Sequence, residues 1–446
     1  MKCFPFFKEK FRGLPSERRS APASISNSKL VSTYGTGTSA SCGSETNKNS
    51  CKSSGSASST RSIPAVFDEK AHNLRVFDFK ELSNATNDFS RLLKIGEGGF
   101  GSVYKGFIKS PEAPGRRATV AIKTLNQNSL QGHKQWLAEV QFLGVVDHPN
   151  LVKLVGYCAS DNERGIQRLL VYEYMPNKSL EHHLFNKAYP VLPWDKRLKI
   201  VVDVAEGLRY LHEGLSIPVI FRDFKASNVL LDENFKPKLS DFGLAREGPS
   251  DGRSHVSTAV MGTHGYAAPE YIETGHLTTK SDLWAFGVVL FEILTGRRAL
   301  DRNLPKPEQR LLDWVKKFPP RSHRFAAVMD PRLEQRYSAA AARMVAELAN
   351  ACLAKSPRDR PAMGEVVESL RRALEVTESG EEPEDQPAAS PRSSDAAAGG
   401  EEQEGGKGAG VAASTKRRLF HLAKLAETAN AEHIRRLYPM HRFNRG

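Results

Sequence analysis

A short polar segment near the middle of the chain contains residue types suited to proton transfer and metal binding. Asp223 and Asn228 stand five positions apart, with Lys225 between them. In a loop, both polar side chains can point at one centre, the aspartate at a hydroxyl nucleophile and the asparagine at a metal ion. The lysine can reach a transferring phosphate. In isolation, the segment is equally plausible as a polar surface turn.

Two further segments offer groups that such a centre would need. Asp241, 13 residues after Asn228, begins the sequence Asp-Phe-Gly. Its carboxylate is a hard oxygen ligand for Mg²⁺, and Gly243 permits a sharp turn. Lys123 ends the run Val-Ala-Ile-Lys, where its charge is costly to bury unless phosphates or a carboxylate such as that of Glu139 match it. The alternative for Lys123 is an edge-strand position with its ammonium group in water.

A glycine cluster precedes this lysine at residues 96–101 and has the sequence Gly-Glu-Gly-Gly-Phe-Gly. Without Cβ atoms, such a segment can bring its backbone close to phosphate oxygens. Dinucleotide-binding folds and ordinary turns use the same spacing, but a dinucleotide site needs a strand before it and a helix after it. Here residues 102–106 continue as a strand. The pattern therefore favours a glycine-rich hairpin that covers ATP.

The elements expected around these residues change in type along the chain. Short strands are predicted at residues 92–95, 103–108 and 119–124, and a helix with one apolar face at residues 131–143. Beyond residue 195 helical spacing dominates, at residues 198–211, 281–294 and 340–353. A small β-rich lobe followed by a larger helical lobe is an α+β arrangement with a cleft between the lobes.

Composition bounds the rest of the chain. The 446 residues are 39% apolar and carry a net charge of +13, and this length corresponds to about two or three domain-sized units. The five cysteines show no pairing or metal-binding spacing, which argues against a disulfide framework or a structural zinc site. The longest apolar stretch, residues 283–291, is far shorter than the roughly 18 residues of a spanning helix. We therefore expect an intracellular protein that does not span a membrane.

Charge divides the chain into five segments. Residues 1–62 hold ten Lys or Arg against three acids, with 16 serines, and predict a disordered, basic, membrane-targeting tail. Residues 63–88 are an N-terminal extension and residues 89–374 the compact body. Residues 375–410 hold ten acids against two basic residues and predict an acidic linker. In the basic tail at residues 411–446, residues 416–437 could form an amphipathic helix that binds a membrane or calmodulin, serves nuclear import, or has no function.

Residues 89–374 resemble the eukaryotic protein kinases, because all of these motifs, and Ala-Pro-Glu at residues 268–270, occur in the family's order and spacing. The resemblance implies a bilobal fold, with an N-lobe at residues 89–175 and a C-lobe at residues 176–374. It implies a serine/threonine kinase rather than a tyrosine kinase, since Lys225 follows the aspartate by two positions and Gly-Thr precedes Ala-Pro-Glu. ATP and Mg²⁺ (or Mn²⁺) would be its cofactors.

The roles that the resemblance implies can be stated residue by residue. Asp223 is the catalytic base, Lys225 stabilises the phosphate, and Asn228 and Asp241 are the metal ligands. Lys123 pairs with Glu139 and holds the α- and β-phosphates, so Lys123 and Glu139 are also counted as catalytic residues. The ATP-binding residues are Ile95, Gly96, Glu97, Gly98, Gly99, Phe100, Gly101, Val103, Ala121, Lys123, Glu173 and Met175. Further residues are a gatekeeper at Tyr172, a brace for the catalytic loop at Asp282, and an ion pair between Glu270 and Arg360.

One position departs from the family pattern. Phe221 stands where the family usually has His and its nearest relatives often have Tyr. The residue has a stacking role near Phe242 and Leu143 and does not transfer protons. We therefore expect activity to survive, with the balance between inactive and active states somewhat altered.

Three stretches, at residues 77–82, 150–158 and 262–271, are similar to the plant receptor-like cytoplasmic kinases of subfamily VII. The opening residues 1–5 are similar to the branch that includes the pattern-triggered-immunity-compromised kinases. Members act downstream of cell-surface immune receptors, which implies protein substrates and membrane receptor kinases as partners. The alternative is a catalytically weak scaffold or pseudokinase, although Lys123, Asp223 and Asp241 are all present. Nucleic-acid binding is not expected, because the basic charge is confined to two tails.

Regulation and location are suggested by residues outside the catalytic motifs. Arg222 can pair with an activation-loop phosphate, and the candidate phosphosites are Ser254, Ser257, Thr258 and Thr263. Thr263 is better suited to hold the region of the substrate hydroxyl, and a solvated loop without a switch role is the alternative for the others.

Cys3 lies among phenylalanines and basic residues, so that acylation there would give a peripheral anchor on the cytoplasmic face of the plasma membrane. The alternative is a free thiol on a protein of the cytoplasm and nucleus.

Overall fold

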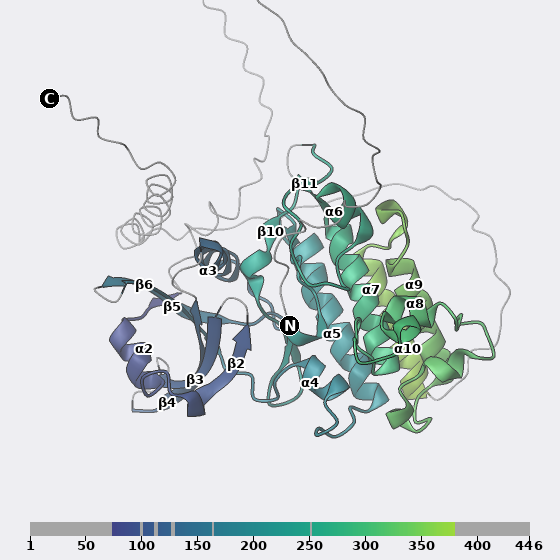
Figure 1. Cartoon of the computed structure of the whole chain (residues 1–446), viewed down its shortest axis with the longest axis horizontal. Coiled ribbons are helices and arrows are strands. Elements are labelled where there is room, and N and C mark those ends of the chain that lie inside the picture. The colour runs from purple at the N-terminus through teal and green to yellow at the C-terminus, as the bar shows by residue number, and fades with distance from the viewer. Residues whose placement is uncertain are drawn as a thin grey trace, which may run out of the picture. The chain divides into compact units, whose positions relative to one another are not determined.

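The computed structural model describes residues 74–98, 101–110, 115–125, 130–162, 165–249 and 252–379. These residues form a sheet-rich lobe followed along the chain by a helical lobe (Figure 1). The expectation of an α+β, bilobal fold is therefore confirmed. Within these ranges, no helix has both the length and the apolar character needed to cross a bilayer. The predictions for residues 1–62 and 411–446, and for Gly99 and Phe100, lie outside the described residues.

The smaller lobe is built on a six-stranded sheet with the order β1-β5-β6-β4-β3-β2. All neighbouring pairs are antiparallel except β1 and β5. The strands are β1 (Arg75–Val76), β2 (Lys94–Gly98), β3 (Gly101–Lys109), β4 (Arg117–Leu125), β5 (Leu154–Asn162) and β6 (Gly165–Glu173). Because side chains alternate along a strand, Leu169 and Val171 of β6 enter one buried cluster, and Leu170 and Tyr172 enter another.

One helix packs on each of these clusters (Figure 1). α2 (Phe79–Ala85) buries Leu82 in the cluster that contains Leu169. α3 (Leu130–Leu143) buries Trp136 and Val140 in the cluster that contains Leu170. The indole Nε1 of Trp136 also donates a hydrogen bond to the Leu169 carbonyl at 3.1 Å. These contacts fix α3 against the sheet and thereby fix the position of Glu139, one turn further along the helix.

One sequence-based expectation in this lobe is partly wrong. The strand expected at residues 92–95 begins only at Lys94, because Arg91–Leu93 form a 3₁₀ turn. The Ser90 hydroxyl accepts a hydrogen bond from the Leu92 amide at 3.4 Å, and the Leu92 side chain is 95% exposed. A local cap therefore prevails over the apolar pattern of the segment. The other predicted strands and helices fall within observed elements or overrun one by a single residue.

The larger lobe is organised around helix α7 (Thr279–Thr295), which is buried along most of its length. At its start the Thr278 amide donates to the Ser281 hydroxyl at 3.2 Å, and Gly296, with φ of 62°, ends it. The other helices are α4 (Leu180–Phe185), α5 (Trp194–Glu213), α6 (Pro269–Thr274), α8 (Leu311–Val315), α9 (Ala339–Cys352) and α10 (Met363–Ser379). α10 extends to Ser379, so the prediction of a linker is wrong for residues 375–379. Val366, Val367 and Leu370 hold this helix in the core.

Three short antiparallel strand pairs carry the loops of this lobe. They are β7 (Val219–Ile220) with β10 (Arg246–Glu247), β8 (Val229–Leu231) with β9 (Pro237–Leu239), and β11 (Val256–Ser257) with β12 (His276–Leu277). In the sequence, β7 ends directly before the predicted catalytic segment and β8 begins directly after it.

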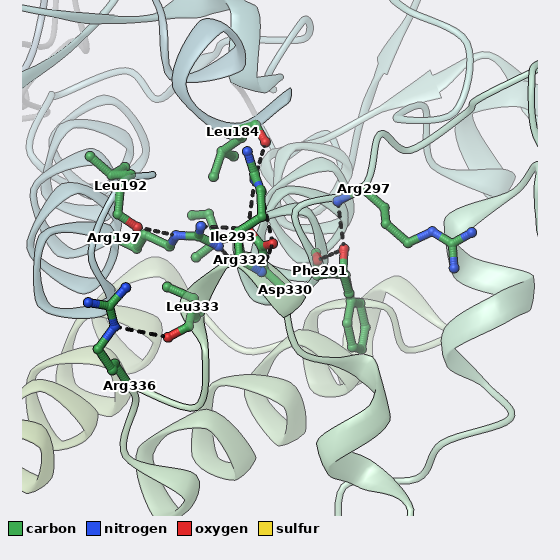
Figure 2. A network of polar contacts seen from close by, with 11 residues as sticks. Leu184, Leu192, Arg197, Phe291, Ile293, Arg297, Asp330, Arg332, Leu333 and Arg336 are labelled. Atoms are coloured by element: carbon green, nitrogen blue, oxygen red, sulfur yellow. Dashed lines mark hydrogen bonds and ion pairs between the residues drawn. The ribbon is translucent and has the colours of Figure 1, made fainter. Parts of the chain in front are cut away.

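A buried charge network ties α5 to the end of α7 (Figure 2). Arg197 of α5, whose side chain has no exposed surface, donates to the Ile293 carbonyl at 2.7 Å and to Asp330 at 2.6 Å. Asp330 also accepts two hydrogen bonds from the Arg332 guanidinium, at 2.7 and 2.9 Å. The carboxylate therefore lies between two guanidinium groups, which is how a buried charge is compensated.

Candidate active site

The carboxylate of Asp282, on α7, holds the predicted catalytic segment through its backbone amides. Asp282 accepts hydrogen bonds from the backbone amides of Phe221 at 2.8 Å and Arg222 at 2.7 Å. The Nε2 atom of His212, at the end of α5, lies 2.8 Å from the same carboxylate. Arg222 adopts a left-handed φ of 73°. Because Asp282 satisfies two consecutive amides, it can hold this uncommon backbone conformation.

Asp223 is the centre of a compact set of polar contacts. Its Oδ2 accepts a hydrogen bond from Lys225 Nζ at 2.6 Å, and its Oδ1 accepts one from the Thr263 hydroxyl at 2.6 Å. Lys225 Nζ also donates to Thr263 Oγ1 at 2.8 Å. The three side chains come from the catalytic segment and from the segment before α6, so the structure brings together residues 40 positions apart.

Asn228 is attached to the same group. Its Nδ2 atom donates to the Asp223 carbonyl at 2.9 Å and approaches the Asp223 carboxylate at 3.4 Å. Since the amide nitrogen is engaged, the amide oxygen is the atom left to bind a metal ion. Asp223, Lys225 and Asn228 are each less than 9% exposed, so their relative positions are fixed by packing as well as by hydrogen bonds.

A second charged cluster joins the two lobes. Lys123 of β4 donates to Glu139 of α3 at 2.7 Å and to Asp241 at 2.9 Å. Burial alone would lower the pKa of Lys123, but the two carboxylates outweigh it and raise that pKa. Burial likewise would raise the pKa of Asp241, yet the Lys123 ammonium holds it below the usual range.

Glu139 is the more enclosed of the two carboxylates. Its side chain has no exposed surface, whereas that of Asp241 is 34% exposed. Burial raises the pKa of Glu139, and Lys123 limits the rise. The Tyr172 hydroxyl donates a hydrogen bond to the second oxygen of Glu139. Burial, followed by the neighbouring Glu139 charge, raises the pKa of Tyr172 well above its ordinary value, so this hydroxyl remains a donor.

Phe221 lies in the apolar stack that the sequence suggested. It is fully buried, and its ring packs edge-on against Phe242 with the centroids 5.0 Å apart. Asp241, just before Phe242, has a left-handed φ of 69°. The Phe221 ring supports the turn that presents Asp241, but it has no polar atom with which to brace that turn.

The glycine-rich hairpin approaches β4 closely at one glycine. Gly101 pairs with Gly98 across the β2–β3 hairpin and has a φ of 151°. A Cβ atom there would lie 1.7 Å from the Thr124 carbonyl oxygen, so only glycine fits. Ile95, Gly96, Glu97, Gly98 and Val103 are described in this hairpin or the adjoining strand, and Ala121 follows on β4.

The segment expected to meet adenine follows β6. The Glu173 side chain accepts hydrogen bonds from Lys238 Nζ at 2.9 Å and from the Lys153 amide at 2.7 Å. The Glu173 amide also donates to the Lys153 carbonyl at 3.1 Å. Since the carboxylate and the amide are both engaged, the backbone carbonyl of Glu173 is the group expected to meet a base. The Met175 side chain is buried.

The activation segment, between Asp241 and Glu270, is fixed at its end. Arg360 makes a bidentate contact with Glu270, at 2.8 and 2.7 Å. Arg222 donates to the Tyr271 hydroxyl at 2.9 Å and to Thr258 Oγ1 at 3.3 Å. Of the four predicted phosphosites, Ser254 and Ser257 are exposed, whereas Thr258 and Thr263 are partly buried.

The residues at the site fit a magnesium–nucleotide complex. Within the described ranges, no group of three or more His, Cys, Asp or Glu side chains is placed to hold a metal ion. Asp241 and Asn228 offer one carboxylate and one amide oxygen. Mg²⁺ typically takes one or two protein oxygens and completes its shell with substrate phosphates and water. A site with few protein ligands therefore matches a metal that arrives with ATP.

Several contacts had no local signal in the sequence. The bonds of Tyr172 to Glu139, of His212 to Asp282 and of Lys238 to Glu173 join residues 33 to 70 positions apart. Periodicity and motif spacing report only on neighbours in the sequence. These supporting contacts appear only once the strands and helices are placed.

The sequence of this chain is similar to those of known protein kinases. A family model described as protein tyrosine and serine/threonine kinase matches residues 89–370. The serine/threonine-protein kinase PCRK1 of Arabidopsis thaliana is 48% identical over 411 residues, covering 92% of this chain and 96% of the relative. Receptor-like cytoplasmic kinase 176 of Oryza sativa subsp. japonica is 48% identical over 356 residues, covering 78% and 89%. The EPD1-interacting receptor-like cytoplasmic serine/threonine-protein kinase of Nicotiana benthamiana is 53% identical over 307 residues, covering 69% and 65%.

The matched region contains both lobes, the Lys123–Glu139 pair and the group around Asp223. The family therefore follows from the motifs, the fold and the relatives together: this chain belongs to the protein kinases, as a serine/threonine kinase of the receptor-like cytoplasmic class.

Proposed function

We propose that Asp223 is the base with which this kinase transfers the γ-phosphoryl group of ATP to protein serine and threonine hydroxyls. The observation that carries the proposal is the contact of both Asp223 oxygens with donors, Thr263 on one side and Lys225 on the other. A substrate hydroxyl would donate to the Asp223 carboxylate in the position that Thr263 borders. The carboxylate takes the proton as the hydroxyl oxygen bonds to phosphorus and the bond to ADP breaks.

The remaining residues act on charge and position. The Lys225 ammonium lies 2.6 Å from the Asp223 carboxylate. It is therefore close to the site of transfer, where it would neutralise negative charge on the phosphoryl group. Lys123, held by Glu139, would bind the α- and β-phosphates, and Asn228 and Asp241 would hold the metal ion. Mg²⁺, when bound, would neutralise charge on the phosphates. We favour Mg²⁺ over Mn²⁺ because the protein donors are hard oxygen atoms.

The test is a transfer assay with the full chain, ATP and a protein substrate. Lys225→Ala should lower kcat by about 100-fold, with the KM for ATP changed less than about threefold, since Lys225 acts on the transferring group. Lys316→Ala is the matched control, because the Lys316 side chain is 75% exposed and pairs with Asp313 on the surface. Equal kcat in the Lys225 variant and the control would refute the role of Lys225. Rates measured with Mg²⁺ and with Mn²⁺ decide the preferred metal.

We also propose that the kinase relays signals from immune receptors at the plasma membrane in plant defence. The proposal is supported by the likeness to receptor-like cytoplasmic kinases, one of which is named for its interaction with EPD1. It is further supported by the first 12 residues, where Cys3 is accompanied by four phenylalanines and by Lys2, Lys8, Lys10 and Arg12. A palmitoyl chain at Cys3 and basic residues near an anionic leaflet would together give stable anchoring.

Fractionation of the full chain in plant cells tests this anchor. Cys3→Ser should move the protein largely to the soluble fraction. Neutralising the four basic residues should weaken retention in a salt-sensitive manner, while kinase activity in solution stays the same. A wild-type protein in the soluble fraction, or a Cys3→Ser protein that stays on the membrane, would refute the anchor.

A further inference from the structure

A histidine of the activation segment, His255, stacks on His276, which follows α6 in the chain. β11 and β12 pair in antiparallel fashion, with Ser257 directly opposite His276. The ring of His276 lies against the ring of His255, with centroids 3.6 Å apart and planes at 26°. His276 is exposed and His255 is half-buried. The imidazole pair therefore lies at the surface of the segment that bears the candidate phosphosites.

Ser257 lies on the same face of the strand pair as the two rings. Residues directly opposite each other in an antiparallel pair project to one side, with Cβ atoms about 4.5–5.5 Å apart. His255 precedes Ser257 by two positions and so shares its side of an extended segment. The Ser254 hydroxyl also lies 3.0 Å from His255 Nδ1. Ser257 is exposed, with one imidazole two positions before it in the chain and the other directly opposite it on β12.

Thr258 has a different environment. The next residue along a strand points to the other face, and Thr258 Oγ1 accepts a hydrogen bond from Arg222 at 3.3 Å. The Thr258 amide donates to the Gly275 carbonyl at 3.1 Å. The two adjacent residues thus have different basic neighbours: Thr258 contacts a guanidinium group, whereas Ser257 lies opposite one of the two stacked imidazoles.

Imidazole rings suit a phosphate in this position. A phosphoserine carries a charge of about −1.5 to −2 and three acceptor oxygens. Histidine offers N–H donors in either protonation state, and two when it is charged.

We propose that His255 and His276 form a binding site for a phosphate on Ser257, separate from the contact between Arg222 and Thr258. The inference rests on the proposed kinase activity and on the sequence-based expectation that the activation segment of this kinase is phosphorylated. In that reaction the Ser257 oxygen bonds to the γ-phosphorus of ATP, ADP leaves, and the hydroxyl proton passes to the catalytic base. The bound phosphate then links β11 to β12 and shields the ester from phosphatases.

The experiment installs the phosphate without using the activity of the protein. Phosphoserine is incorporated at position 257 by codon reassignment in the full chain carrying Asp223→Asn, and removal by a phosphatase of broad specificity is followed by mass spectrometry. Replacing both histidines (His255→Phe with His276→Phe) keeps two stacking rings but removes the donors. Removal at position 257 should become at least about fivefold faster. Phosphothreonine incorporated at position 258 in the same two backgrounds is the matched control, and its removal should change less than twofold.

A second measurement uses unsubstituted histidines. The 13 histidines are labelled with a stable isotope and their imidazole groups are observed by NMR. Phosphoserine at position 257 should shift two imidazole resonances, and these two resonances should be absent from the double phenylalanine variant. Unchanged imidazole signals, or equal acceleration of removal at positions 257 and 258, would overturn the proposal. Because the phosphoserine is incorporated during translation and not by the kinase itself, failure of the kinase assay leaves this test intact, and failure here leaves the kinase assay intact.

Discussion

Removing the carboxylate of Asp330 should unfold the larger lobe at markedly lower denaturant concentration. Asp330 is 2% exposed and lies between Arg197 and Arg332 (Figure 2). Asp330→Ala leaves the buried Arg197 charge with carbonyl partners only. Breaking a buried ion pair from one side costs about 3–5 kcal/mol, and the loss of the Arg332 contacts places the expected cost in the upper part of that range.

A double-mutant cycle separates the pair from its surroundings. Arg197→Met should cost about 2–3 kcal/mol, because Asp330 keeps the hydrogen bonds from Arg332. The double variant should cost at least about 1.5 kcal/mol less than the sum of the single costs. Arg336→Met, at a residue whose side chain is 75% exposed, is the control and should change stability by less than about 0.5 kcal/mol.

Urea unfolding followed by tryptophan fluorescence is the assay, since Trp194 lies on the same helix as Arg197. Burial would raise the pKa of Asp330, but the hydrogen bonds from Arg332 and Arg197 lower it. The contribution of Asp330 should therefore be present above the pKa of an unfolded aspartate and be lost as the pH falls through the lowered value. A cost of less than about 1.5 kcal/mol for Asp330→Ala, or additive single costs, would refute the reasoning.

Three further changes probe other buried contacts. Tyr172→Phe removes the donor to Glu139 and should lower kcat/KM by about 3- to 10-fold in a steady-state assay; an unchanged value would remove Tyr172 from the positioning of Glu139. Burial raises the pKa of Glu292 from 4.5 to about 8. The folded state therefore holds a proton that the unfolded state releases, and stability should fall as the pH rises across this interval. Glu292→Gln should reduce this dependence of the unfolding free energy on pH, measured by urea titrations at several pH values. An unaltered pH dependence would contradict the raised pKa of Glu292. Arg360→Lys cannot keep the bidentate contact with Glu270 and should lower the free energy of unfolding in urea by about 2–3 kcal/mol. A loss below about 0.5 kcal/mol would show that the bidentate contact contributes little to stability.

The four helices predicted from the sequence are all observed, because these helices are long and strongly periodic. Trp136 and Val140 of α3, for example, are fully buried on the expected face. The strand at residues 92–95 was misplaced, because a single serine cap shifts its start to Lys94. The boundary between the compact body and the acidic linker was also misplaced, because residues 375–379 continue α10 although their acidic neighbours indicated a linker.

The candidate site residues were identified through motifs, whereas the contacts that support them were not. Asp223 and Lys123 stand in local patterns that a sequence displays directly. Tyr172, by contrast, donates to Glu139 from 33 residues away, and the Arg197–Asp330 pair spans 133 residues. Such pairs depend on how helices and strands pack, which no local pattern encodes. The stack of His255 on His276 belongs to the same class.

The most direct test of the account is phosphotransfer by the full chain with Asp223→Asn. The substitution removes the carboxylate that contacts Lys225 and Thr263 but leaves the Lys123–Glu139 contact in place. Transfer from ATP to a serine-containing protein should fall by at least about 100-fold, while ATP binding measured by calorimetry should change less than about threefold. Asp313→Asn, on the exposed surface, should retain full activity. Transfer by Asp223→Asn at the wild-type rate would contradict the assignment of Asp223 as the base.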